Sequence, residues 1–265
     1  MTRWILNHGD CLDPVSGLAS LADKSVDVVI SDPPYEAEAH TEQRRQKGVC
    51  TTVSGNSEFR EVNETPLDFG AITPAQRTEA AAQMSRVARQ RAVVFCQAEA
   101  VQAWREAFDA AGMPYRRAMV WVKPDAMPSL HGRWPGQAFE SIVVAQHRSA
   151  KACPIGGKSK VYTHTRDASL YSRGGVVASA PHPTTKPLRL MLDLVADFTD
   201  PGDLILDPFA GSGTTAIAAL MLGRRFVGWE RDANYHAIAT RRINGDEAKP
   251  REEQPSLFGS IGGTR

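Results

Sequence analysis

Hydrophobic and polar positions alternate along the chain in blocks that predict strands and helices in succession. Short apolar runs, typical of buried strands, end at turns rich in glycine, proline and aspartate. They predict strands at 4–8, 26–30, 92–95, 117–122, 141–145, 204–207 and 226–229. Apolar residues at helical spacing predict helices at 16–21, 74–90, 99–110, 188–198, 214–222 and 234–243. This alternation predicts an α/β fold in which helices cover both faces of a parallel sheet.

Two stretches interrupt the alternation and define the domain organisation. Residues 36–73 are polar and have no sustained period, which predicts a long, mobile loop insertion. Residues 146–181 are rich in glycine, serine and lysine. We therefore expect one domain over 1–244, carrying the loop insertion at 36–73 and a basic segment at 146–181. A charged, flexible tail is expected at 245–265.

The charge is distributed unevenly, although the net charge of the 265 residues is only +1. Residues 115–190 contain 12 basic and 3 acidic residues, whereas the stretches on either side are net negative. A local basic patch is sufficient for phosphate contacts. The middle of the chain is therefore predicted to face an anionic partner.

Composition excludes several other classes of protein. Hydrophobic residues make up 42% and charged residues 23%, which is typical of a globular domain. No apolar run is long enough for a membrane span, and the first ten residues do not resemble a secretory signal, so we expect a cytoplasmic protein without a membrane partner. The four cysteines are scattered without a CxxC spacing, and neither a metal site nor a disulfide framework is predicted.

A glycine-rich turn follows the strand predicted at 204–207. Gly211 and Gly213 allow the backbone to approach a ligand closely, and the helix that follows offers free N–H groups to an anion. Glu230 ends the next strand, at about the spacing where an acidic residue binds ribose hydroxyls. An ordinary strand-to-helix turn would also accept these glycines, but the flanking Asp207 and Glu230 favour a nucleotide-like ligand.

The residues after these glycines narrow the choice of ligand. Gly213 is followed by Thr214 rather than lysine, so the turn is not a P-loop. The third glycine of a dinucleotide-binding fingerprint is replaced by Ala216. S-adenosylmethionine is the ligand of this class that best suits the turn and Glu230.

A second turn, Asp32-Pro33-Pro34-Tyr35, follows the strand predicted at 26–30. Its prolines fix the backbone, so that two carbonyl groups are held as acceptors beside a carboxylate. An exocyclic amino group of a nucleobase is a poor nucleophile, and accepting its N–H bonds would free its lone pair. Tyr35 offers a flat face for an extruded base. The alternative interpretation of Asp-Pro-Pro-Tyr is a tight turn with an exposed tyrosine and no catalytic role. The presence of the glycine turn in the same chain makes this alternative less favoured.

Three motifs in order resemble the amino-methylating DNA methyltransferases, in particular the permuted β group, whose catalytic half precedes the cofactor half. The motifs are Ser31-Asp32-Pro33-Pro34-Tyr35, then His182-Pro183-Thr184-Thr185-Lys186-Pro187 after the basic region, and finally the turn at 207–215. The resemblance covers the chain to about residue 244 and implies that the domain at 1–244 is a single catalytic methyltransferase domain. It implies a Rossmann-like S-adenosylmethionine-dependent methyltransferase sheet with a circularly permuted motif order.

The resemblance also assigns roles to individual residues. It implies that Asp32, Pro33, Pro34 and Tyr35 are catalytic, with Asp32 and the Pro33 carbonyl binding the target amine and Tyr35 stacking on the flipped base. Glu230 would bind the ribose of the cofactor, Asp10 its far end, and Thr184 with Lys186 its methionine moiety. The remaining implied cofactor contacts are Asp207, Pro208, Phe209, Ala210, Gly211, Ser212, Gly213 and Thr214.

The implied reaction is direct transfer of a methyl group to nitrogen. Methylation at C5 of cytosine is excluded because no cysteine follows a proline. Within the β group, Asp32 before Pro-Pro-Tyr favours adenine N6, and cytosine N4 is the alternative. An RNA or protein methyltransferase would usually carry Asn-Pro-Pro-Tyr with the glycine motif upstream. An inactive cofactor-binding module that interacts with DNA is the alternative from a different class.

Double-stranded DNA is the expected partner. The resemblance identifies the basic segment as the target-recognition segment. The residues predicted to contact DNA are Arg44, Arg45 and Lys47 in the loop insertion, and Arg148, Lys151, Lys158, Lys160, Arg166 and Arg173 in the basic segment. That segment is short, so recognition either covers few base pairs or is completed by the second subunit of a homodimer. The tail sequence Gln254-Pro255-Ser256-Leu257-Phe258 resembles peptides that dock on the bacterial sliding clamp.

Overall fold

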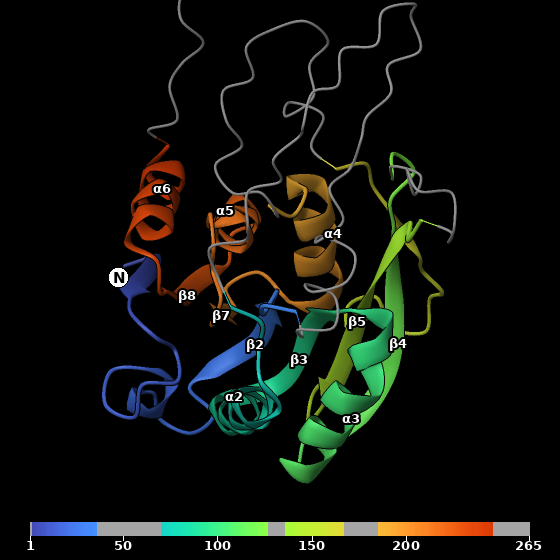
Figure 1. The fold of residues 1–265 in the computed structure, drawn as a ribbon, viewed down its shortest axis with the longest axis horizontal. Helices are drawn as coiled ribbons and strands as arrows, with labels where there is room; N and C mark the ends of the chain where they lie inside the picture. The colour runs from blue at the N-terminus through green and yellow to red at the C-terminus, as the bar shows by residue number, and fades with distance from the viewer. Residues whose placement is uncertain (1, 36–69, 127–135, 167–184, 246–265) are drawn as a thin grey trace, which may run out of the picture.

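The computed structural model describes residues 2–35, 70–126, 136–166 and 185–245. These residues form an eight-stranded sheet in the order β1-β8-β7-β2-β3-β5-β4-β6 (Figure 1). The strands are β1 (Trp4–His8), β2 (Val26–Ser31), β3 (Ala88–Cys96), β4 (Tyr115–Val122), β5 (Phe139–Gln146), β6 (Tyr162–Thr163), β7 (Leu204–Asp207) and β8 (Arg225–Glu230). The sheet therefore joins strands from both ends of the predicted catalytic domain.

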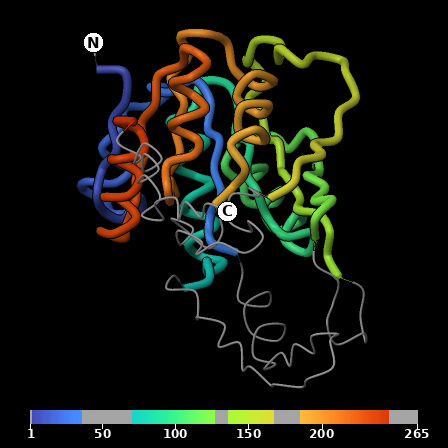
Figure 2. Tube along the Cα trace, turned by 90° about the horizontal axis from the view of Figure 1, so that it is seen from above, coloured from blue at the N-terminus to red at the C-terminus, as the bar shows by residue number. Residues whose placement is uncertain are grey.

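Helices cover both faces of this sheet, as the sequence predicted. They are α2 (Pro74–Val87), α3 (Val101–Ala110), α4 (Leu188–Phe198), α5 (Thr214–Met221) and α6 (Ala233–Asn244), with short 3-10 turns η1 (Leu18–Ser20) and η2 (Ala98–Ala100). Helices α2 and α3 lie on one face, and α4 and α5 on the other (Figure 1). Figure 2 shows α6 beside the N-terminal strand at one end of the sheet.

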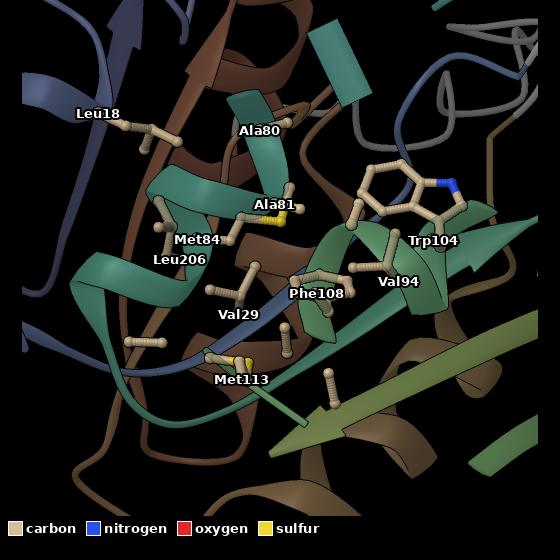
Figure 3. Close-up of a cluster of buried hydrophobic side chains, with 14 of the residues drawn as sticks. Leu18, Val29, Ala80, Ala81, Met84, Val94, Trp104, Phe108, Met113 and Leu206 are labelled. Carbon is tan, nitrogen blue, oxygen red and sulfur yellow. The ribbon is translucent and has the colours of Figure 1, made fainter. Parts of the chain in front are cut away.

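Successive side chains of β2 point to opposite faces of the sheet, so this one strand contributes to the hydrophobic core on each face. Val29 packs on the face of α2 and α3, where Figure 3 shows it near Met84 and Phe108. Val28 and Ile30 point to the opposite face and join the side chains of α4 and α5. All five of these side chains are fully buried. A strand buried on both faces is expected to be continuously apolar, and the sequence of β2 has this character.

The direction of one strand differs from the prediction. β2 pairs in parallel with β3 and β7, and β8 pairs in parallel with β7 and β1. β5, however, runs antiparallel to both β3 and β4, so the expectation of a wholly parallel sheet is wrong. A parallel connection needs a crossover, usually a helix, and the described residues between β4 and β5 contain none.

The strand order brings two distant parts of the chain together at the centre of the sheet. β2 and β7 are direct neighbours, with Val29 opposite Leu206. From β2 the chain continues to β3 on one side, and from β7 it continues to β8 on the other. A ligand crevice in an open α/β sheet forms where the strand order reverses in this way, at the carboxyl ends of the strands. We call the edge formed by the carboxyl ends of β2, β3, β7 and β8 the catalytic edge. The edge formed by the amino ends of these strands is the far edge.

Several predicted boundaries shift in the structure. The helix predicted at 16–21 is only the turn η1, and the helix predicted at 74–90 ends at Val87 because β3 begins at Ala88. α2 begins sharply because Thr73 and Gln76 form a reciprocal capping box ahead of the helix, with proline at its first position. Most of the predicted loop insertion, at 36–69, lies outside the described residues, as do 167–184 of the basic segment and 246–265 of the tail. In the part of the chain that the structure describes, no helix is long and apolar enough to cross a membrane.

Candidate active site

The Asp-Pro-Pro-Tyr turn follows β2 directly at the catalytic edge. Asp32 Oδ2 accepts a hydrogen bond of 2.5 Å from Lys186 Nζ. Asp32 Oδ1 is buried and has no hydrogen-bond partner among the described residues. Burial raises the pKa of Asp32, against the lowering effect of the Lys186 ammonium. One carboxylate oxygen is therefore held by the protein, and the other is available as an acceptor.

Glu140, at the start of β5, holds the other end of the turn. Its Oε2 accepts a hydrogen bond of 2.6 Å from the Tyr35 hydroxyl and lies 3.2 Å from Lys186 Nζ. Its Oε1 lies 2.7 Å from Lys123 Nζ. Burial opposes ionisation of Glu140, but Lys186 and Lys123 lower its pKa to about 2. An ionised Glu140 thus fixes the hydroxyl of the tyrosine that was predicted to stack on a base.

Lys186 lies immediately before Pro187, the residue that precedes α4. Its ammonium lies 5.5 Å from the ring centre of Tyr35 and 5.0 Å from that of Phe95. The side chain is 9% exposed. The resemblance placed Lys186 at the methionine moiety of the cofactor, whereas its contacts here are with the catalytic turn. Thr184, its predicted companion, lies outside the described residues.

Asp207, at the end of β7, joins the two predicted turns. Its Oδ1 accepts hydrogen bonds from Ser31 Oγ (2.7 Å) and the backbone N–H of Phe209 (3.1 Å), and its Oδ2 accepts one from Thr215 Oγ1 (2.6 Å). Burial raises the pKa of Asp207 to about 6. Because Ser31 immediately precedes Asp32, this one carboxylate ties the catalytic turn to the glycine turn.

The glycine turn has the backbone that its sequence required. Gly211 has φ 52° and Gly213 has φ 81°, both in the left-handed region that favours glycine. A Cβ added at Gly213 would come within 3.1 Å of the Ala239 Cβ, so this residue is needed for close packing against α6. Apart from the chain neighbours of Gly211, no atom of the described residues lies within 4 Å of a Cβ added there. Within the described part of the chain, Gly211 therefore borders open space at the start of α5.

Two acidic residues lie beside this turn. Glu230 Oε2 accepts a hydrogen bond of 2.8 Å from the Gly211 N–H, and its Oε1 accepts one of 2.7 Å from the Asp232 N–H. Burial raises the pKa of Glu230. Asp10 follows β1, the neighbour of β8, and its Oδ1 accepts a hydrogen bond from the Leu12 N–H. The adjacent strands β7, β8 and β1 thus bring Gly211, Glu230 and Asp10 to one edge, as a cofactor site would need.

The far side of the glycine turn is held by Arg242, a residue that the sequence analysis did not single out. Arg242 Nη1 donates to the carbonyl oxygen and to the hydroxyl of Ser212, at 2.6 Å and 2.8 Å. Ser212 Oγ also lies 3.2 Å from Thr185 Oγ1. Thr214 and Thr215 begin α5 and are buried. The turn is therefore fixed before any ligand arrives.

The basic residues predicted to bind DNA do not form one group. Three of them are in ion pairs: Lys151 with Asp200 (2.6 Å), Lys160 with Asp197 (2.6 Å) and Arg166 with Asp125 (3.4 Å). Arg148 follows the end of β5 and lies at the far edge, because β5 is antiparallel to β3. Lys151 lies at the same edge, because its partner Asp200 precedes β7. Lys158 donates its backbone N–H to the Ile155 carbonyl near the end of α4. Arg44, Arg45, Lys47 and Arg173 lie outside the described residues.

Sequence reasoning missed Glu140 and Lys123 as parts of the site. One signal for Glu140 was available, since it is one of only three acidic residues in the basic stretch at 115–190. An isolated acid among many basic residues often has a specific partner. Within the ranges the structure describes, no group of three or more histidine, cysteine or acidic side chains is arranged to hold a metal ion.

Comparison with known proteins identifies the family of this chain. The model of a DNA methylase family matches residues 26–241, and the chain belongs to this family. YubD of Escherichia coli (strain K12) is 27% identical over 245 residues, which cover 92% of this chain and 90% of YubD.

Two solved structures share the fold. The crystal structure of an M1.HpyAVI-SAM complex has a TM-score of 0.65 at 23% identity, covering 91% of this chain and 99% of the other. The PvuII DNA methyltransferase, described as cytosine-N4-specific, has a TM-score of 0.66 at 15% identity, covering 94% and 89%. These likenesses confirm the Rossmann-like methyltransferase sheet.

Proposed function

We propose that this DNA methylase transfers a methyl group from S-adenosylmethionine to the exocyclic amino group of a flipped base, adenine N6, at a specific DNA site. The observation that carries the proposal is the buried Asp32 Oδ1, which lacks a partner among the described residues and lies in the turn that also holds Tyr35. A buried acceptor without a partner is costly, and an amino group of the substrate would satisfy it.

The catalytic turn can activate an amino group by accepting its protons. Asp32 Oδ1 and the Pro33 carbonyl would accept the two N–H bonds and draw the nitrogen towards tetrahedral geometry. Tyr35, fixed through Glu140, would stack on the extruded base. The raised pKa of Asp32 suits this carboxylate to take the proton that the nitrogen loses as its bond to the methyl carbon forms and the bond between that carbon and the sulfonium sulfur breaks, which would leave a neutral thioether.

S-adenosylmethionine is the cofactor, and it supplies a methyl group on a reactive sulfonium when bound. The glycine turn fits it, because Gly211 borders open space where a side chain would project, and Glu230 lies within hydrogen-bond distance of the same residue. We assign the ribose hydroxyls to Glu230 and the far end of the cofactor to Asp10. The residues of the turn assigned to the cofactor are Asp207, Pro208, Phe209, Ala210, Gly211, Ser212, Gly213 and Thr214.

Cytosine N4 is the second candidate for the methylated position. The likeness to the cytosine-N4-specific PvuII enzyme favours it, whereas Asp32 ahead of Pro-Pro-Tyr favours adenine by family resemblance. Both amino groups could be bound by the same acceptors. The distinction therefore depends on how the rest of the base is recognised.

DNA is proposed to approach the catalytic edge, since the target base must reach Asp32. Arg166 lies near this edge, because it follows β6, and β6 runs parallel to the end of β4. Arg148 and Lys151 lie at the far edge and are expected to contribute less. Arg44, Arg45, Lys47 and Arg173 remain predicted contacts outside the described residues.

Two further partners belong to the proposal. The tail sequence at 254–258 is proposed to dock on the sliding clamp, and a pull-down with clamp should lose the protein when Leu257 and Phe258 are changed to alanine. A second subunit is proposed to complete recognition of the DNA site. Sedimentation with and without DNA would reveal such a homodimer.

The methylated product tests the proposal directly. Purified protein is incubated with unmethylated DNA and labelled S-adenosylmethionine, and the nucleosides are separated and weighed by mass spectrometry. N6-methyladenine that is absent with Asp32→Ala is the expected result. N4-methylcytosine would replace the base assignment, and the absence of any labelled nucleoside would overturn the proposed function.

A further inference from the structure

The ammonium of Lys186 lies between the two carboxylates of the candidate active site. It is 2.5 Å from Asp32 Oδ2 and 3.2 Å from Glu140 Oε2. The sequence separates it from Asp32 by 154 positions, and it reaches the turn because α4 begins at the catalytic edge beside β2. Almost all of its side chain is buried. A cation in this position is engaged by the catalytic turn itself.

The contacts restrict what Asp32 can do. A carboxylate on a short side chain can rotate, and rotation would exchange the partnered oxygen with the unpartnered one. Lys186 binds Oδ2 and is itself anchored to Glu140, whose other oxygen is held by Lys123. This chain of charge-assisted hydrogen bonds fixes the carboxylate plane, and Oδ1 remains without a partner among the described residues.

We propose that Lys186 is a positioning residue for the methyl transfer: its ammonium holds Asp32 ionised and oriented, so that Oδ1 faces the amino group of the base. The inference rests on the proposed function and replaces the cofactor contact that resemblance implied for this lysine. Glu140 serves the same arrangement by anchoring both Lys186 and Tyr35.

Several charged groups face Asp32 and decide its ionisation. The buried position raises the pKa of Asp32, Lys186 lowers it most strongly, Glu140 raises it and Lys123 lowers it. Asp207, at the end of the neighbouring strand β7, interacts with Asp32 through their like charges. Loss of the Lys186 charge would therefore leave Asp32 facing two carboxylates and one lysine, and its pKa would rise.

The first experiment observes this carboxylate without DNA or cofactor. Protein labelled with ¹³C at the aspartate carboxyl carbons is titrated by NMR, and Asp32→Asn assigns the resonance. Lys186→Met should move the Asp32 titration to higher pH, whereas Arg105→Gln, which removes an exposed cation on α3, should leave it unchanged. An identical Asp32 titration in wild type and Lys186→Met would overturn the proposal.

The second experiment separates positioning from cofactor binding. By calorimetry, Lys186→Met should bind S-adenosylmethionine within about twofold of wild type, and kcat at neutral pH should fall about 100-fold with little change in the KM for DNA. The acid limb of the kcat profile should move to higher pH. A tenfold loss of cofactor affinity with an unchanged Asp32 titration would instead make Lys186 a cofactor ligand and overturn the inference.

A conservative variant protects the test against misfolding. Lys186→Arg keeps the positive charge, so the Asp32 titration should stay close to wild type and kcat should lie between those of wild type and Lys186→Met. If the Asp32 carboxylate of Lys186→Arg titrates as in the wild type but the variant is as inactive as Asp32→Ala, the proposal that Lys186 acts through its charge is contradicted. If the wild type methylates no DNA, the proposed function fails, and the NMR titration still decides the role of Lys186.

Discussion

Asp32 and Asp207 occupy comparable places at the carboxyl ends of two neighbouring strands, yet their surroundings differ. Asp207 accepts three hydrogen bonds from neutral groups and has no cation among its described hydrogen-bond partners. Asp32 is paired with Lys186 on one oxygen and has an unpartnered second oxygen within the described part of the chain. The carboxylate of Asp207 is therefore taken up by bonds that join the two turns, whereas one oxygen of Asp32 is left as the acceptor that we propose for the amino group.

The comparison predicts the largest effect for the pH dependence of stability. Burial raises the pKa of Asp207 from 3.8 to about 6, so the folded state disfavours its ionisation. Stability is therefore highest when this group is protonated and decreases as the pH rises from about 4 through 6. Above pH 6 the loss from this group is about 3 kcal/mol.

Asp207→Asn tests this prediction in urea unfolding experiments between pH 5 and 7. In this window Glu140, whose pKa is lowered to about 2, stays ionised. Burial also raises the pKa of Asp32, so any titration of that carboxylate changes stability in the same direction as that of Asp207. The wild type should lose stability across the window, and the variant should show a shallower slope. Equal slopes would mean that Asp207 is not the titrating group.

The second prediction concerns the two contributions of Tyr35. Tyr35→Ala removes the stacking face and should lower kcat/KM for DNA about 100-fold, since stacking on an aromatic ring is worth about 1–3 kcal/mol per base. Tyr35→Phe removes only the hydrogen bond to Glu140 and should cost less than tenfold. Steady-state kinetics of both variants measure the difference, and equal losses would place the function in the hydroxyl instead of the ring.

The third prediction concerns the glycine turn alone. Gly211→Ala adds a Cβ in the left-handed region and directs it into the open space assigned to the cofactor, so S-adenosylmethionine affinity should fall about tenfold, a change of about 1.4 kcal/mol. Gly202→Ala is a matched control, because Gly202 also has a positive φ and its added Cβ would meet none of the described residues, but Gly202 precedes β7 at the far edge. Calorimetry should show a loss of affinity for the first variant only.

The smallest predicted effect is on the salt dependence of DNA binding. Arg166→Gln at the catalytic edge should reduce the slope of log K against log salt by about 1, and Lys151→Gln at the far edge should leave it unchanged. Fluorescence anisotropy at several salt concentrations measures both. A reduced slope for Lys151→Gln would place DNA across the far edge as well.

The sequence predicted local features better than it predicted long-range ones. The bounds of α4 and β7 agree with the prediction because apolar spacing and the Asp-Pro turn define them locally. The direction of β5 could not be predicted, since alternation has the same period in parallel and antiparallel strands. The partnership of Lys186 with Asp32 joins residues 154 positions apart and depends on how α4 docks beside β2. The order of the motifs located the catalytic turn and the glycine turn. Only the folded sheet shows that the carboxylate of Asp207 joins them.

One measurement distinguishes the two carboxylates most directly. Wild type, Asp32→Asn and Asp207→Asn are each assayed for S-adenosylmethionine binding by calorimetry and for a single turnover of DNA methylation by nucleoside mass spectrometry. Asp32→Asn should bind the cofactor within about twofold of wild type while its single-turnover rate falls at least about 100-fold. Asp207→Asn should weaken both cofactor binding and turnover. Methylation by Asp32→Asn at the wild-type rate would contradict the assignment of Asp32 as the group that binds the amino nitrogen.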